Sequence, residues 1–556
     1  MAMVTEAPRS AALAVAASII LFAPAVVRRR LSAIYMTDRI RGQKTLRRAL
    51  PIGLLAFAFR FLTLSPLEND HFVMLARAQQ VLFGDWPIRD FEDPGQPLFY
   101  LLTSALSSIF GHVLATNVVL CITLQAVAAA FTYVLARRAS NSTTVGVAAA
   151  LLVIISSPRL YNTTKVIVPA VAIFLQWQYA QAPRRGHLLA LAAWTALSFL
   201  LRHDYVVYVV ASTFVLLAVI HQSKPREAIV QATVYGVAAL LMVLPWLAYV
   251  QWNEGLIEYA SAALRFVQSE GRRTAAGPPQ PLYYVMAFVL PLSGLALAIR
   301  LRSRRDSTTT VNQAQLASLA VLVLMMNAAF LRDVLVARLP DVAGPTAILI
   351  ASLIGQTFSR RVLRVSAVVM TAAVLVLVTI SMATAGYRVP TPAAVVRQAS
   401  RVSQRLVHTS AEIQPSPRYP ELVSYLARCT RPDQRVFVSG FAPQISFLAH
   451  RRFAAGLPSW IPGYYETAPD VQRARARLER ENVAAVVLLE GADAFEQSWP
   501  DLAAWFREHR YERRDSSRLG DAMTLWVPAP GVSSTTDADS GLPCDTSGTL
   551  AGSSEP

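Results

Sequence analysis

Long apolar runs alternate along this chain with short polar segments that are mostly basic. A run of about 15 to 20 apolar residues is long enough to cross a bilayer as a helix. Repeated runs separated by loops rich in arginine and lysine are typical of a protein that crosses a membrane many times with its basic loops in the cytoplasm. The pattern predicts about eleven to twelve spans, the clearest at 49–65, 113–136, 145–157, 166–180, 188–201, 205–220, 229–250, 282–299, 311–330, 346–358 and 365–385.

Two further apolar segments do not fit this topology as spans. Residues 97–110 are short and open with a proline, and a crossing there would move every later basic cluster to the wrong side, so we expect a juxtamembrane helix. The run 11–27 precedes its arginines, whereas a secretory signal carries its charge first. We therefore interpret 1–48 as an N-terminal segment with an extra apolar run and a basic cytoplasmic stretch, in which Met36 is an alternative start site.

Composition supports the assignment to membrane proteins and argues against nucleic acid as a binding partner. Of 556 residues, 54% are hydrophobic and only 16% are charged, with a mean hydropathy of +0.39, whereas soluble domains carry roughly 25% charged residues. The net charge of +17 comes from clusters between apolar runs, which excludes the basic stripe of a nucleic-acid-binding protein. Three cysteines show no metal or redox spacing, and Cys429 and Cys544 share a compartment that permits a disulfide.

The pattern changes after the last apolar run. We divide the chain into a membrane domain at 49–390, a small extracytoplasmic α/β domain at 391–528 and a disordered tail at 529–556, which is rich in serine, threonine and glycine. Within the α/β domain no catalytic triad, phosphate loop or metal spacing is present, so we expect it to cover the membrane site or simply to pack. Strands are predicted at 435–440 and 484–489, and helices at 420–429, 471–481 and 500–509.

The first external loop, 66–97, concentrates the acids of a chain in which acids are scarce. They are Glu68, Asp70, Asp85, Asp90, Glu92 and Asp93. Ionisable groups near a bilayer are costly to desolvate and tend to mark a site or a pathway. The alternative is a solvent-exposed loop whose acids have no role beyond keeping it hydrated.

The order of residues in this loop resembles a known family. Asp70 is followed by the amphipathic FVMLARAQQVLFG and then by DWPIRDFEDPGQPLFYLL. This is similar to the first external loop of GT-C membrane glycosyltransferases, especially those related to glycosyltransferase family 39, with an Asp-Pro-x-x-Pro-Leu-x-Tyr segment. The segment VFVSGFAPQISFLAHRRFAAGLPSWIPGYY resembles the part that follows the membrane domain in that group. One departure is His71, where many members have a glutamate.

The resemblance implies a polytopic helical GT-C-like fold and transfer of a sugar from a polyprenyl phosphate to an acceptor hydroxyl. Asp70 is then the candidate general base, and a helix-capping role is its alternative. Asp93 is the candidate second acid, steering the acceptor or holding a metal ion with Asp70, and an ordinary turn residue is its alternative. Asp90, Glu92 and His71 are weaker candidates for substrate binding.

A lipid phosphate that leaves the sugar needs a cation at the outer membrane surface. The external basic candidates are Lys165, Arg202, His203, Arg332 and Arg338. Snorkelling to the headgroups, or pairing with Asp204, Asp333 or Asp341, is the alternative for each. The stretch LIEYASAALRFV, at 256–267, has the amphipathic pattern of a helix that lies in the interface and gates access of the lipid.

The sequence thus predicts a multi-pass glycosyltransferase of the bacterial inner membrane, with a polyprenyl-phosphate sugar as donor. The acceptor (lipid, glycan or protein) and the need for a divalent metal ion stay open. A transporter or flippase of a lipid-linked or amphipathic solute is the main rival, but it favours acids in mid-span and an internal repeat, and we find neither in the sequence. A non-catalytic scaffold with a partner-binding external domain is the third alternative.

Overall fold

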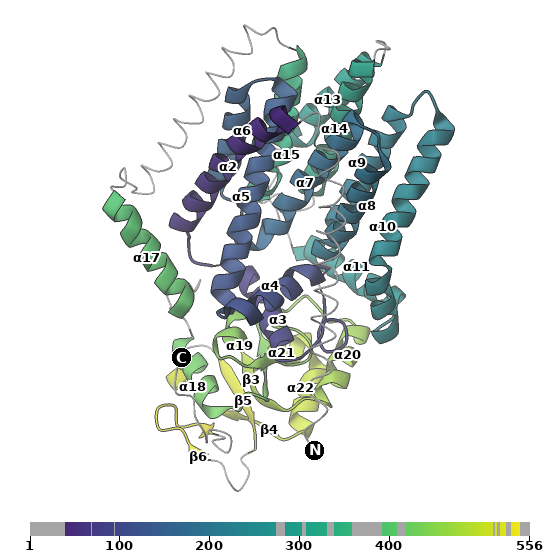
Figure 1. Ribbon diagram of the computed structural model, residues 1–556. Coiled ribbons are helices and arrows are strands. Elements are labelled where there is room, and N and C mark those ends of the chain that lie inside the picture. The colour runs from purple at the N-terminus through teal and green to yellow at the C-terminus, as the bar shows by residue number, and fades with distance from the viewer. Residues whose placement is uncertain are drawn as a thin grey trace.

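The computed structural model describes residues 39–67, 69–93, 95–273, 284–302, 307–330, 338–357, 392–408, 419–514, 517–519, 523–529 and 535–544. A bundle of long helices stands above a smaller domain that contains a β-sheet (Figure 1). The predictions for 1–38, for Arg332 and for the span 365–385 lie outside the described residues.

A helix lies in every predicted span that falls within the described residues. Within the described residues, five of these helices (α5, α9, α10, α14 and α15) are long and apolar enough to cross a membrane. Apolar side chains on α10, such as Ile229 and Leu241, are 67% and 60% exposed, which suits a surface that faces lipid. The bundle helices are α2 (Arg39–Leu62), α5 (Val113–Ser140), α6 (Thr143–Ser156), α7 (Thr163–Gln181), α8 (Arg185–Leu201), α9 (His203–Ile220), α10 (Pro225–Asn253), α13 (Leu290–Leu301, preceded by the π-helical η2, Val285–Val289), α14 (Ser307–Phe330) and α15 (Leu339–Thr357).

Further helices cover the end of the bundle that faces the sheet domain (Figure 1). They are α3 (Asn69–Leu82), α4 (Pro97–Phe110), the 3-10 turn η1 (Leu160–Asn162) and α11 (Leu256–Arg273). The α4 helix has 14 residues, starts at its proline and packs on α3 and α5. Its position relative to the membrane stays a prediction. The amphipathic stretch at 256–267 forms the first part of α11.

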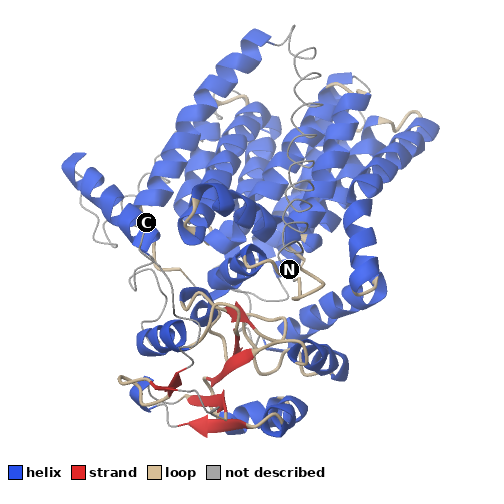
Figure 2. Cartoon of the chain, turned by 60° about the horizontal axis from the view of Figure 1, so that its bottom comes forward, coloured by secondary structure: helices blue, strands red, loops and turns tan. Residues whose placement is uncertain are grey.

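The C-terminal domain is an α/β sandwich around a five-stranded sheet with the order β2-β1-β3-β5-β4 (Figure 2). Strands β2, β1 and β3 are parallel, whereas β5 runs antiparallel to β3 and β4. The elements are α18 (Pro420–Cys429), β1 (Arg435–Ser439), α19 (Gln444–Leu448), β2 (Arg452–Phe453), α20 (Ala468–Leu478), β3 (Val483–Leu488), α21 (Ala492–Ser498), α22 (Pro500–Glu508), β4 (Tyr511–Arg514), η5 (Ser517–Leu519) and β5 (Thr524–Pro528). The preceding helix, α17 (Pro392–His408), packs on α2 and α5 of the bundle instead.

Alternating side chains of this sheet build two separate cores. Phe437 and Val486 pack with Trp499 and Phe506 on one face. On the other face Val436, Val438 and Val487 pack against α18 and α19. Because successive residues of a strand point to opposite faces, an apolar run such as RVFVS is explained by burial on both sides.

Part of the tail that we predicted to be disordered is ordered. Strands β6 (Thr535–Thr536) and β7 (Pro543–Cys544) pair as a small antiparallel ribbon. A disulfide joins Cys544 to Cys429 at the end of α18, and Tyr425 Oη donates a hydrogen bond to the carbonyl of Pro543. The prediction of disorder is wrong for 535–544. The disulfide and these contacts hold the segment in place, although its own residues provide little apolar surface to bury.

Aromatic contacts fix the C-terminal domain against α3 and the loop that follows it. Phe72 of α3 lies 5.8 Å from Phe447 of α19, measured between ring centroids, and Phe91 lies 5.7 Å from Phe453 of β2. Phe72 and Phe91 are completely buried. The acidic loop is therefore enclosed between the bundle and the domain.

Candidate active site between the bundle and the C-terminal domain

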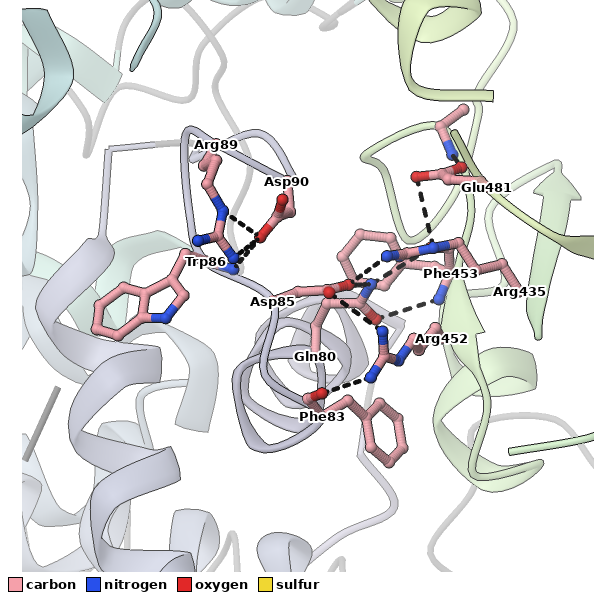
Figure 3. A network of polar contacts seen from close by, with 11 residues as sticks. Gln80, Phe83, Asp85, Trp86, Arg89, Asp90, Arg435, Arg452, Phe453 and Glu481 are labelled. Atoms are coloured by element: carbon pink, nitrogen blue, oxygen red, sulfur yellow. Dashed lines mark hydrogen bonds and ion pairs between the residues drawn. The ribbon is translucent and has the colours of Figure 1, made fainter. Parts of the chain in front are cut away.

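The acids of the loop do not form one cluster in the structure, because some of them bind the C-terminal domain. Asp85 is buried and accepts from Arg435 Nη2 at 2.7 Å, while its other oxygen faces Arg452 Nη1 at 3.3 Å (Figure 3). Gln80 donates to the same carboxylate at 2.6 Å. Arg435 also faces Glu481 at 3.6 Å, so Asp85 belongs to a network that joins the two domains.

Glu92 and Asp90 likewise have structural partners. One oxygen of Glu92 lies 3.4 Å from Arg473 and 3.5 Å from Arg477, both on α20. Asp90 accepts from the backbone N–H of Trp86 at 2.7 Å and from Arg89 at 2.6 Å, within its own turn (Figure 3). These contacts account for both carboxylates without a substrate.

Asp93 contacts Tyr259, which comes from a distant element and in turn contacts His203. Its Oδ1 accepts from the backbone N–H groups of Gly95 and Gln96 at 3.1 and 3.0 Å, which is the turn role we considered. Its Oδ2 accepts from the hydroxyl of Tyr259 on α11 at 2.6 Å. The Tyr259 hydroxyl lies 3.3 Å from Nε2 of His203 at the start of α9. Burial and the neighbouring Asp93 raise the pKa of Tyr259, so the phenol keeps its proton and donates it.

A glycine allows the loop to approach His203 this closely. Gly95 has a φ of +87°, and a Cβ at this position would lie 2.9 Å from His203 Nδ1. The His203 backbone N–H donates to the Gly95 carbonyl at 3.0 Å. The Asp-Pro-Gly turn of the sequence therefore fixes Asp93 beside α9 through backbone contact.

Basic residues gather around a buried aspartate at the same end of the bundle. Lys165 Nζ of α7 lies 3.3 Å from Asp341 Oδ2 of α15, and Asn162 donates to that oxygen at 2.9 Å. The Asp341 side chain is 0% exposed, and its Oδ1 has no hydrogen-bond partner among the described residues. Arg202 and Arg338 are close enough to act electrostatically on both members of this pair. Arg202 also pairs with Asp204 at 2.8 Å.

The junction between α8 and α9 connects the two groups of residues. Arg202 belongs to the basic cluster, and the next residue, His203, contacts Tyr259 beside Asp93. The structure thus brings together Asp93, His203, Lys165, Arg202 and Arg338 at one end of the bundle. Among the described residues, Lys165, Arg202 and Arg338 lie near the carboxylates of Asp341 and Asp204, so this region offers cations to an anion.

Asp70 and His71 occupy opposite environments although they are neighbours. Asp70 is exposed in the first turn of α3, and Asn69 before it donates to the Phe441 carbonyl of the C-terminal domain at 2.6 Å. His71 is completely buried, and burial together with the Arg60 charge lowers its pKa to about 3. His71 is therefore a neutral packed residue, whereas Asp70 is accessible where the two domains meet.

Sequence reasoning missed Tyr259, and it treated Asp341 only as an alternative partner for arginine. Amphipathic spacing indicated that α11 has a buried face, but no pattern showed that Tyr259 reaches Asp93. Among the described residues, one group of three possible metal ligands lies together, formed by Cys429, Asp537 and Cys544. Two of these are joined in the disulfide, so this group is not a metal site. The need for a metal ion, with Asp70 and Asp93 as the candidate ligands, stays open.

Comparison with known proteins gives a limited result. No family model matches the chain, and no curated protein is significantly similar in sequence. Among solved structures, the chain is similar to ArnT from Cupriavidus metallidurans bound to undecaprenyl phosphate, at 13% identity and a TM-score of 0.48, over 89% of this chain and 100% of that one. The apo state of the same protein gives 13% identity and a TM-score of 0.48 over 88% and 100%. This degree of likeness by itself assigns no function to the chain.

Proposed function

We propose that the chain is a GT-C-type glycosyltransferase of the bacterial inner membrane that moves a sugar from a polyprenyl phosphate to an acceptor hydroxyl at the outer face. The observation that carries the proposal is the Arg202–His203 junction, which joins a carboxylate site to a cluster of cations at one end of the bundle. The resemblance of the acidic loop to GT-C enzymes supplies the reaction class. The chain's own residues supply the roles below.

In the proposed reaction the acceptor oxygen attacks the anomeric carbon in a single displacement. Asp70 takes the hydroxyl proton as the new carbon–oxygen bond forms. The bond between the anomeric carbon and the phosphate oxygen breaks at the same time, and its electron pair leaves with the lipid phosphate. Lys165 and Arg202 neutralise the charge that develops on that phosphate. Inversion at the anomeric carbon follows from the single step.

Asp93 fits an orienting role better than a base role. Both of its oxygens already accept hydrogen bonds, from two backbone N–H groups and from Tyr259. Asp70 is exposed beside the C-terminal domain, where an acceptor arriving from solvent would reach it. We therefore assign proton abstraction to Asp70 and placement of the acceptor or donor to Asp93.

The disulfide supports the proposed orientation. Disulfides persist in oxidising compartments and are rare in a reducing cytosol. Cys429 and Cys544 are joined within the C-terminal domain, and the domain packs on the acidic loop. Both would therefore lie on the outer side of the membrane, which is where the topology derived from basic loops also puts the acidic loop.

The test is the variant Asp70→Asn, assayed by release of undecaprenyl phosphate from a set of synthetic undecaprenyl-phosphate sugars. Loss of a general base lowers such a rate about 100- to 10,000-fold. Asp501→Asn is the matched control, because Asp501 is also an exposed acid in the first turn of a helix, on α22. Release at the wild-type rate by a well-folded Asp70→Asn variant would show that Asp70 is not the general base. Movement of the intact donor across vesicles without release would favour the flippase.

A further inference from the structure

Arg473 of α20 binds acids from three other parts of the chain and one acid on its own helix. It pairs with Glu92 of the acidic loop at 3.4 Å and with Glu254 at the end of α10 at 3.7 Å. It also pairs with Glu258 of α11, and with Asp470 on its own helix at 2.5 Å. The side chain is 18% exposed, so these contacts are largely shielded from water. One guanidinium of the C-terminal domain thus connects the acidic loop to α11.

Two of these acids immediately precede the residues of the candidate site. Glu92 is followed by Asp93, and Glu258 is followed by Tyr259. Asp93 and Tyr259 share the hydrogen bond of 2.6 Å described above. Arg473 therefore contacts the residue before each partner of that bond, Glu258 through a hydrogen bond and Glu92 through a longer ion pair. A shift of α11 away from the loop would have to break the contacts of Arg473 first.

Neighbouring arginines extend this connection. Arg265 lies on α11 about two turns after Glu258. It pairs with Glu258 at 2.7 Å and with Asp470 at 3.2 Å. Arg477, one turn after Arg473, lies 3.5 Å from Glu92. A planar guanidinium with several donors can bind more than one carboxylate in fixed directions, which a lysine ammonium does less well. The arrangement has the geometry of a brace between the loop, α11 and α20.

We propose that Arg473 is a positioning residue that holds Tyr259 on Asp93, so that the C-terminal domain sets the geometry of the membrane site. This inference rests on the proposed function in one respect, the role of Asp93 in transfer. The other part, that Arg473 holds the acidic loop against α11, does not depend on the proposed function. The two parts can be measured separately.

The experiment compares Arg473→Ala, Arg473→Lys and Arg475→Ala in the full-length protein. Arg475 is the matched control because it lies on the same helix and is exposed. Hydrogen–deuterium exchange is followed in α11 and in residues 85–93, with α22 as an internal measure of domain folding. We expect Arg473→Ala to raise exchange in both segments about tenfold, which corresponds to the loss of about 1.4 kcal/mol of local stability. Arg475→Ala should leave exchange unchanged, and Arg473→Lys should fall between them.

Release of undecaprenyl phosphate from the synthetic donors is the second readout. Arg473→Ala should lower it about tenfold, and added guanidinium ions should restore part of the rate. Unchanged exchange in α11 and the loop of Arg473→Ala overturns the brace. Raised exchange with unchanged release leaves the brace standing and overturns the role of Asp93 in transfer. Raised exchange in α22 as well would show general unfolding, and it too would overturn a positioning role.

Discussion

Two groups of buried charges lie close to the same end of the bundle but are satisfied to different degrees. In the network that docks the C-terminal domain, both oxygens of Asp85 are bonded, to Arg435, Arg452 and Gln80. In the basic cluster, Asp341 is fully buried yet one of its oxygens has no partner among the described residues. Arg202 and Arg338 also act electrostatically on Asp341.

The difference separates a structural network from a candidate binding site. A buried polar group without a partner costs free energy, so natural proteins keep few of them. A fully bonded carboxylate such as Asp85 holds two parts of the molecule together and offers nothing to a ligand. The basic cluster offers ammonium and guanidinium donors, which an anionic group can use. We therefore expect changes in the two groups to separate stability from binding.

The largest effect is expected for Lys165→Met. This change leaves the buried Asp341 without its lysine, and breaking a buried pair on one side costs about 3–5 kcal/mol. The double variant Lys165→Met with Asp341→Leu should recover most of that stability, because it removes both charges. Unfolding midpoints in detergent, compared with that of the wild-type protein, measure the loss in the single variant and its recovery in the double variant.

The double variant also tests the binding side of the comparison. Undecaprenyl phosphate should raise the unfolding midpoint of the wild-type protein, because a ligand that binds the folded state stabilises it. The double variant should fold but show a much smaller shift, since the Lys165 cation is missing. A full shift in this variant would mean that the basic cluster does not bind the phosphate.

A smaller loss is expected for Asp85→Ala. It leaves Arg435 and Arg452 without their carboxylate, but these side chains are 11% and 27% exposed, so solvent offsets part of the cost, and we expect about 2 kcal/mol. The stabilisation by undecaprenyl phosphate should persist. Asp433→Ala is the control, because Asp433 pairs with Arg431 at an exposed site. Loss of the ligand-induced shift in Asp85→Ala would contradict the separation of the two groups.

The smallest effect is expected from His71 near neutral pH. Its pKa is lowered from 6.5 to about 3, chiefly by burial. Above pH 6.5 the ring is neutral in both states, whereas below it the unfolded chain binds a proton that the folded chain does not. Stability should therefore fall by about 1.4 kcal/mol for each pH unit between 6.5 and 3. Unfolding midpoints against pH measure this slope, which His71→Gln should reduce. An equal slope in both proteins would show that His71 does not cause this dependence of stability on pH.

Much of the fold could be predicted from short-range patterns. Apolar runs gave the positions of the bundle helices, and the proline at 97 together with the short run gave α4. The strands at 435–440 and 484–489 match β1 and β3 to within a residue. These elements depend on hydrophobic burial of a contiguous segment, which local sequence reports directly. The ordered ribbon at 535–544 was missed because it depends on a disulfide to a residue far away in the chain.

The sequence by itself determined that this is a helical membrane protein with an acidic loop, an amphipathic segment and a soluble C-terminal domain. Only the tertiary structure decided that Asp85 and Glu92 dock that domain, that His71 is buried, and that Tyr259 meets Asp93. The reason is physical. Burial of an apolar run follows from its own residues, whereas the partner of a charge depends on which distant segments pack beside it, because the interaction acts through space over a few ångströms.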